Sequence, residues 1–228
     1  MESGGEAQVV VWRAWGVALT QRYKESWFDK HFRFSAPVAV LLFLGSLVIN
    51  TLATAYATER ASNYVEDIIL SNTPAYDMSW FFVYGLLFMV AFIMLLCLWH
   101  PRRIPFILHS LTLFMLIRSA FVSLTHLGPF PIQDTGDFGN IITKLFFSSD
   151  LFFSGHTGAP FLMALMFWHE KNLRYIFLSL SIFFGIIVLL GHYHYTIDVL
   201  SAFFITYGIY HIALWLFPKD RALFLLSN

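Results

Sequence analysis

The sequence predicts an all-α, polytopic membrane protein with six transmembrane helices in one bundle. Its 228 residues are 58% apolar and only 12% charged, whereas an average soluble domain is about 45 to 50% apolar and about 25% charged. A helix that crosses a bilayer core of about 30 Å needs about 20 mainly apolar residues. Runs of this kind recur six times along the chain, so we do not expect a soluble monomer.

The six expected spans are separated by short polar connections. They cover residues 35–57, 80–99, 104–127, 149–168, 173–191 and 195–217. Apolar runs of this length are the usual signature of membrane-spanning helices. We therefore expect residues 34–217 to form one six-helix transmembrane domain.

The two flanking segments are expected on the cytoplasmic side. Residues 1–33 place Trp and other apolar residues among Arg and Lys at helical spacing. This pattern is typical of an amphipathic helix that lies on the membrane surface. Residues 218–228 are expected to form a short cytoplasmic tail.

The positions of Lys and Arg predict the orientation. Eleven of them lie in residues 1–33, in the connections after the second and fourth spans, and in the tail. Only Arg60 and Lys144 lie in connections on the opposite side. Because cytoplasmic loops are enriched in Lys and Arg, both termini should be cytoplasmic.

Charge and cysteine content exclude several classes of function. Fourteen basic residues balance fourteen acidic ones, so no basic surplus is available to hold a nucleic acid backbone. Cys97 is the single cysteine, which excludes an intrachain disulfide.

Four ionisable residues within the spans form the candidate site. Such groups are costly at membrane depth and usually face the interior of a bundle. Arg118 lies fourteen residues into the third span, about 21 Å from its cytoplasmic end. His156 begins the fourth span, and His194 and Asp198 begin the sixth. All four should lie at one level, near the extracytoplasmic face.

Spacing and composition suggest roles for these groups. His194 and Asp198 are four residues apart on one helix face, so the carboxylate can orient the imidazole as a base or nucleophile. Asp150 precedes Ser154, Gly155 and Thr157 at a helix start, where a capping serine and free N–H groups favour a phosphate oxygen. The alternative is that the His and Asp side chains only form hydrogen bonds between helices.

The other histidines divide into two groups. His192 precedes His194 by two residues and either closes the site or is structural. The rest have no partner at a telling spacing and are expected to be structural: His31, His100, His109, His126, His169 and His211.

Two motifs resemble the type 2 phosphatidic acid phosphatase superfamily, and within it the sphingomyelin synthase branch. They are Ser154-Gly-His-Thr157 and His194-Tyr-Thr-Ile-Asp198. The longer segments 149–157, 192–204 and 118–131 also resemble that branch, and the resemblance spans about residues 80–217. It implies a polytopic lipid enzyme whose catalytic residues are His156, His194 and Asp198.

Two departures from the family patterns bear on the substrate. The chain has no Lys-x6-Arg-Pro motif of the phosphatases, and Val188 stands where they have an arginine before the second histidine. Tyr193 stands where sphingomyelin synthases have an aspartate. A phosphate monoester carries nearly two negative charges and needs several cations, whereas a phosphodiester carries one. A lone Arg118 therefore favours headgroup transfer over dephosphorylation.

The resulting hypothesis is a two-step headgroup transfer that needs no metal or cofactor. His194 attacks the phosphorus of a membrane phospholipid donor such as phosphatidylcholine, and a phosphohistidine forms as diacylglycerol leaves. His156 serves as general acid and then as general base for a lipid alcohol acceptor, ceramide or diacylglycerol. Arg118 and the N–H groups after Gly155 hold the phosphate oxygens. Tyr193 and neighbouring aromatics either contact the choline cation or pack against lipid.

Alternatives remain open at this stage. A lipid phosphate phosphatase or a phospholipase C-type hydrolase would use the same residues. A transporter would use His156, His192, His194 and Asp198 as a zinc or proton site. Other readings are a non-catalytic lipid-binding protein and a serine hydrolase built on Ser154. The expected location is the plasma membrane, or a Golgi membrane with the site facing the lumen.

The orientation can be tested by cysteine accessibility. In a Cys97→Ser background, single cysteines at Asp137 should react with an impermeant thiol reagent added outside intact cells. Cysteines at exposed positions near Arg103 and Lys171 should react only after the membrane is opened, because the positive-inside rule places these connections in the cytoplasm. The reverse pattern would overturn the orientation.

Overall fold

The fold is all-helical, as predicted. The computed structural model describes residues 3–132 and 151–226, and no strand occurs within these ranges. The α-helices are α1 (Ser3–Phe28), α2 (Lys30–Glu59), α3 (Ser79–Trp99), α4 (Ile104–Leu124), α6 (Gly155–Met166), α7 (Lys171–Leu190), α8 (Thr196–Leu216) and α9 (Pro218–Leu225). Two short 3₁₀ turns, η1 (Leu70–Asn72) and η2 (Pro101–Arg103), lie in the connections.

Among the described residues, five segments are long and apolar enough to cross a membrane. They are α2, α3, η2 with α4 (Pro101–Leu124), α7 and α8, with mean hydropathy between 1.6 and 2.8. Large apolar side chains on their outer faces are exposed, among them Leu41, Phe88, Leu95, Phe204 and Trp215. A continuous apolar surface of this kind fits contact with lipid. Five of the six expected spans are therefore confirmed by length and composition.

The fourth expected span is shorter than predicted. In the described part of residues 149–168, α6 covers 12 residues, about 18 Å of helix. The preceding residues 151–154 are not helical, because Ser154 caps the helix from inside the bundle. In the described part of the chain, the bundle therefore has five long helices and α6, which is about half as long.

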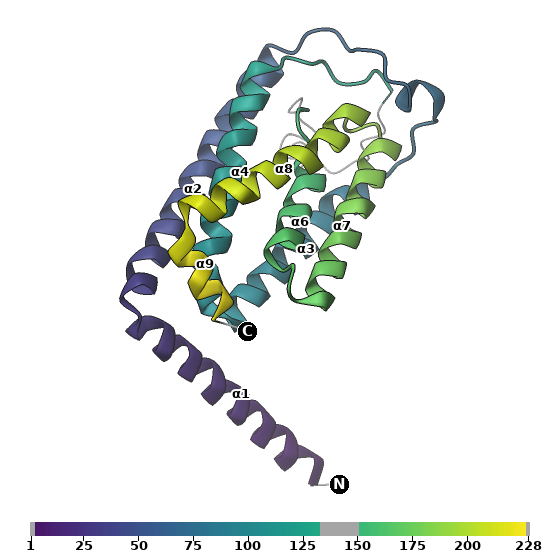
Figure 1. Cartoon of the computed structure of the whole chain (residues 1–228). Coiled ribbons are helices and arrows are strands. Elements are labelled where there is room, and N and C mark those ends of the chain that lie inside the picture. Colours follow the sequence, from purple (N-terminus) through teal and green to yellow (C-terminus); the bar gives the residue numbers. More distant parts are fainter. Residues whose placement is uncertain (1–2, 133–150, 227–228) are drawn as a thin grey trace.

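The helices of the bundle pack in two groups (Figure 1). α2 runs along α4, while α6 packs against both α7 and α8. α8 crosses between the groups and also contacts α4. The buried core at their junction is rich in phenylalanine and includes Phe106, Phe114, Phe153, Phe177 and Phe184.

Arginine side chains join the connections at one end of the bundle. Arg22 of α1 donates to the carbonyl oxygen of Trp99 at 3.0 Å. Arg103 of η2 lies 3.1 Å from a carboxylate oxygen of Glu170, in the connection between α6 and α7. The arm, the turn after α3 and the turn after α6 thus meet here, and the C-terminus lies nearby (Figure 1).

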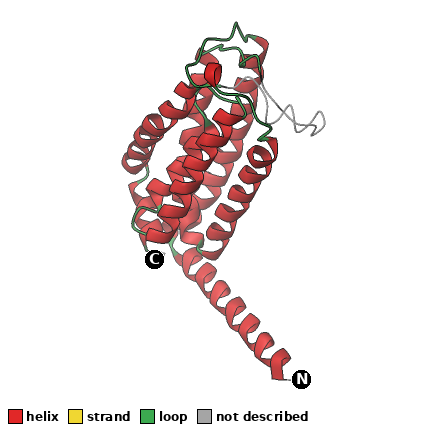
Figure 2. Ribbon diagram, turned by 90° about the vertical axis from the view of Figure 1, so that its right-hand side faces the viewer, coloured by secondary structure: helices red, strands yellow, loops and turns green. Residues whose placement is uncertain are grey.

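The described segments after α2, after α4 and before α8 meet at the opposite end, seen at the top of Figure 2. Ser62 donates to the carbonyl oxygen of His126 at 2.6 Å. The Asp67 carboxylate accepts from the backbone and hydroxyl of Thr196, each at 2.7 Å. The connections thus separate into the two groups from which the orientation is predicted, and which end faces the cytoplasm stays a prediction.

Asp29 separates the arm from the bundle. Its carboxylate accepts hydrogen bonds from the N–H groups of His31 and Phe32, at 2.8 and 3.1 Å. This is an N-cap, which satisfies donors that the first turn of α2 leaves unpaired. The first expected span, α2, therefore begins at Lys30, earlier than residue 35. α1, on the other side of Asp29, leaves the bundle at an angle (Figure 2).

A buried carboxylate anchors α9, which lies in the predicted tail. Asp220 accepts hydrogen bonds from the rings of His31 at 2.7 Å and His109 at 2.8 Å, and from the Ser35 hydroxyl at 2.6 Å. His31 and His109, which are expected to be structural, contact this carboxylate from 189 and 111 positions away, so no local spacing reveals their partner. Burial raises the pKa of Asp220, but these hydrogen bonds outweigh it and lower the pKa below its ordinary value.

We expect Asp220→Asn to lower the free energy of unfolding by about 2 kcal/mol, since bonds to a buried charged acceptor are lost. The pKa of the folded state is lowered, so this stabilisation is present above about pH 4 and is lost as the pH falls through that pKa. Thermal unfolding in detergent at several pH values measures it. Glu59→Gln, at an exposed acidic residue, is the control. An equal loss in both variants would contradict the anchoring role.

Candidate active site

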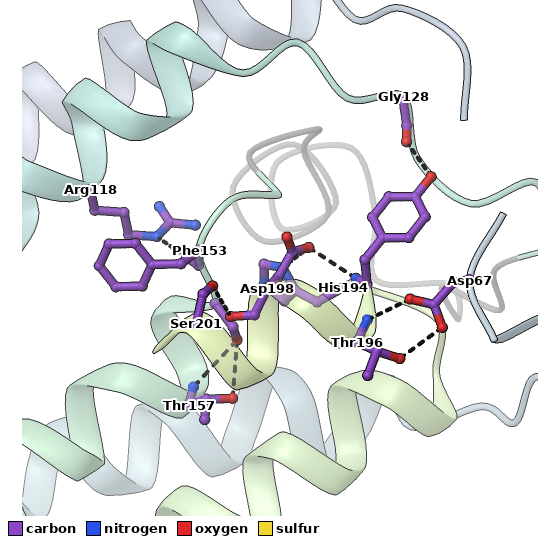
Figure 3. A network of polar contacts seen from close by, with 11 residues as sticks. Asp67, Arg118, Gly128, Phe153, Thr157, His194, Thr196, Asp198 and Ser201 are labelled. Carbon is purple, nitrogen blue, oxygen red and sulfur yellow. Dashed lines mark hydrogen bonds and ion pairs between the residues drawn. The ribbon is translucent and has the colours of Figure 1, made fainter. Parts of the chain in front are cut away.

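Three helices bring the predicted site residues together at the end away from α1. α4 carries Arg118, and residues 154–157 lie at the N-terminus of α6. His194 lies two residues before α8, and Asp198 lies in its first turn (Figure 3). A continuous set of polar contacts links them. The convergence expected from sequence is therefore present in the described part of the chain.

The Asp198 carboxylate lies beside the His194 ring, one turn further along the chain. Its Oδ2 lies 3.4 Å from Nδ1 of His194, and the two side chains are 0% and 6% exposed. The same oxygen accepts the backbone N–H of Tyr195 at 2.9 Å, which fixes the carboxylate at the start of α8. With Nδ1 facing the carboxylate, Nε2 of His194 is the nitrogen left for chemistry.

The backbone of Asp198 also holds the start of α6. Its carbonyl oxygen accepts the N–H of Ser154 at 3.1 Å. The Ser154 hydroxyl oxygen accepts from the N–H and the hydroxyl of Thr157, at 3.4 and 3.2 Å. Ser154 is fully buried and serves as the predicted N-cap, which leaves the serine hydrolase reading without support.

Arg118 lies directly against the start of α6. Its Nε donates to the carbonyl oxygen of Phe153 at 3.0 Å, and Nη1 donates to Oδ1 of Asn50 at 3.4 Å. A Cβ atom at Gly155 would lie only 3.2 Å from Nε of Arg118, so a residue without a side chain permits this approach. The guanidinium and the first N–H groups of α6 together create a positive region suited to an anion.

His156 completes the group. Its ring stacks on Phe82 of α3, with centroids 3.8 Å apart and an interplanar angle of 18°, and bonds to the Phe82 backbone. His194 and Arg118 lie near enough to affect this ring electrostatically. Nε2 of His156 is buried without a hydrogen-bond partner and is available to exchange a proton.

The remaining predicted residues lie at the border of this group or outside the described ranges. His192 is 2% exposed, has a left-handed backbone with φ of 57°, and its Nδ1 lies 3.0 Å from the carbonyl oxygen of Ile132. The Tyr193 ring packs against Phe82 with centroids 4.8 Å apart. Asp150 falls in residues 133–150, outside the described part.

Three residues of the site were missed by sequence reasoning. Asn50 is a polar residue within an apolar run, and this position could have indicated a role in the site. Its Oδ1 accepts hydrogen bonds from Arg118 and from the Ser119 hydroxyl. Phe82 carries no signal in a chain that is 19% aromatic. Asp67 binds Thr196, and although burial raises its pKa, hydrogen bonds from Thr196, Leu70 and Ile69 lower it below its ordinary value.

Among the side chains that the structure describes, no three His, Cys, Asp or Glu residues are grouped as metal ligands would be.

One known protein family is similar to part of the chain. Residues 148–214 match the family model described as PAP2 superfamily C-terminal. The matched segment contains both histidine motifs and leaves Arg118 outside. This similarity supports a membrane lipid enzyme of phosphatase or phosphotransferase type, and the narrower resemblance to sphingomyelin synthases stays a prediction. Searches of curated proteins and of solved structures gave no match.

The stacking of Phe82 on His156 predicts a change in histidine reactivity. We expect Phe82→Leu to raise the rate at which diethyl pyrocarbonate modifies His156 several-fold, because the flat ring that covers the imidazole is removed. Peptide mass spectrometry measures the rate. Phe81→Leu makes the same change at an exposed neighbour and should leave it unchanged. Equal rates in all three proteins would show that Phe82 does not shield His156.

Proposed function

We propose that this chain is a membrane lipid phosphotransferase. It moves a phosphocholine-type headgroup from a glycerophospholipid to an alcohol acceptor such as ceramide. The observation that carries the proposal is the grouping of an Asp198-oriented His194, a second imidazole at His156 and a guanidinium at Arg118 around one helix N-terminus. These are the parts that a nucleophilic phosphoryl transfer requires.

The charge of the site favours a phosphodiester substrate. Within residues 16–132 and 151–226, whose side chains are described, Arg118 is the single buried Lys or Arg at this end. One guanidinium and the N–H groups of Gly155 and His156 match the single negative charge of a diester. A monoester would leave nearly one charge uncompensated in a largely buried site.

The first step transfers the headgroup to the enzyme. Nε2 of His194 attacks phosphorus, and the bond from phosphorus to the diacylglycerol oxygen breaks. His156 gives its proton to that oxygen, so diacylglycerol leaves as a neutral alcohol. Asp198 stabilises the positive charge that develops on the His194 ring.

The second step transfers the headgroup to the acceptor. His156, now neutral, takes the proton of the ceramide hydroxyl, and the oxygen attacks phosphorus. The bond from phosphorus to His194 breaks, which restores both histidines. The residues act in the same places in both steps, so one site suffices for the exchange.

Water is the competing acceptor and would make the enzyme a phospholipase C-type hydrolase. Products separate the two reactions. With labelled phosphatidylcholine, transfer to ceramide yields labelled sphingomyelin, whereas hydrolysis yields free phosphocholine. The predicted orientation places this reaction at the extracytoplasmic face, in a plasma membrane or on the lumenal side of a Golgi membrane.

The proposal predicts a covalent phosphohistidine at His194. After rapid quench with labelled donor, wild-type protein should retain acid-labile, base-stable label, and His194→Ala should retain none. Asp198→Asn should lose about 10²-fold to 10⁴-fold in rate, by analogy with other triads in which the orienting carboxylate is neutralised. His156→Ala should still label slowly with a nitrophenyl phosphodiester, whose leaving group needs little protonation.

His211→Ala is the matched control, because this histidine is exposed and its Nδ1 lies 2.9 Å from the carbonyl oxygen of Tyr207 in its own helix. It should label as wild type does. Label in His194→Ala together with none in His156→Ala would show that the two roles are reversed. A functional wild type that never labels would replace the covalent scheme with direct displacement.

A further inference from the structure

A cavity lies at the end of the molecule opposite the candidate active site. It has a volume of about 280 Å³ and lies between α1, the turn η2 and Leu226 at the end of α9. Ligand pockets usually measure about 300 to 1,000 Å³. This cavity is therefore large enough for a lipid headgroup and too small for the acyl chains as well.

Arg102 brings an uncompensated positive charge to this cavity. The next residue in the turn, Arg103, is 2% exposed and is paired with Glu170. Arg102 instead lines the cavity, is half-buried, and has no hydrogen-bond or ion-pair partner within the described residues. A guanidinium has five N–H donors, so Arg102 is ready to bind an anion that enters.

Arg22 places a second guanidinium in the same lining. Its Nη1 donates to the carbonyl oxygen of Trp99 at 3.0 Å, and its centre lies 4.9 Å from the centroid of the Trp99 ring. These contacts hold the side chain in place from one side. Its other donors are available to a ligand without a change of conformation, which reduces the entropy lost on binding.

Glu25 adds one negative charge to the cavity. Its Oε1 accepts from Nε2 of Gln21 at 3.0 Å, and the residue is otherwise exposed. His100 also lines the cavity, and burial, with the nearby charges of Arg103 and Arg22, lowers its pKa to about 4. His100 is therefore neutral at pH 7, and two guanidiniums with one carboxylate leave a net charge of one positive.

We propose that this cavity binds the headgroup of an aminophospholipid, with its phosphodiester at Arg102 and Arg22 and its ammonium group at Glu25. The negative phosphodiester would face the two guanidiniums, and the positive ammonium would face the Glu25 carboxylate, so each end of the headgroup meets the opposite charge. A neighbouring carboxylate would repel a purely anionic headgroup and attract an ammonium. Trp99 at the end of α3 is the kind of residue that marks the membrane interface, where such headgroups lie.

This site is separate from the one that binds substrate and does not depend on the proposed function. Its lining joins α1 to η2 and to the end of α9. A bound headgroup would hold these three segments together. Basic pockets at the cytoplasmic ends of membrane helices commonly bind phospholipid headgroups in this way.

Native mass spectrometry of the full-length protein in detergent tests the proposal. Protein is titrated with phosphatidylethanolamine, with phosphatidylglycerol and with inorganic phosphate. We expect Arg102→Gln to weaken binding of phosphatidylethanolamine about tenfold or more, because charge-assisted hydrogen bonds are lost. Lys24→Gln removes the same charge from an exposed position on α1 and should leave binding unchanged. Equal binding by both variants would overturn the proposal.

Glu25→Gln tests the ammonium contact. It should reduce the preference for phosphatidylethanolamine over phosphatidylglycerol, and an unchanged preference would overturn that assignment. Inorganic phosphate should not displace the lipid at equal concentration, and displacement would show that free phosphate is the ligand. Thermal unfolding without added lipid checks that each variant is folded. If Arg102→Gln is not, Arg102→Lys keeps the charge and should weaken binding less.

Discussion

Asp198 is the residue on which the geometry of the candidate site depends. Its side chain pairs with His194 and accepts the N–H of Tyr195, while its backbone carbonyl accepts the N–H of Ser154. One residue thus determines where α8 begins, how the imidazole is turned and where α6 starts. The side chain is fully buried, so this arrangement is shielded from competition by water.

Features within one stretch of chain were predictable. The apolar runs indicate the long helices because membrane thickness sets their length. The cap at Ser154 and the pairing of His194 with Asp198 follow from spacings of three and four residues. In each case local geometry alone brings the groups together, so no knowledge of the tertiary fold is needed.

Contacts between distant segments were not predictable from one sequence. Arg118 meets Asn50 from a position 68 residues away, and Asp220 meets His31 from 189 residues away. Hydropathy shows that a helix crosses the membrane but not which neighbour it faces. The same limitation explains why Phe82 was overlooked: its role depends on α3 lying beside the start of α6, not on the residues around it.

The short length of α6 affects where the reaction takes place relative to the membrane surface. A helix of about 18 Å is shorter than a hydrocarbon layer of about 30 Å. With the C-terminal end of α6 at one face of that layer, its N-terminus would lie about 12 Å below the other face. Under the proposed function, the N-terminus of α6, with Arg118 alongside, would present positive charge below the level of the headgroups. A donor lipid would then have to sink to reach it. Water is scarcer there than at the membrane surface, which would favour a lipid alcohol over water as the acceptor.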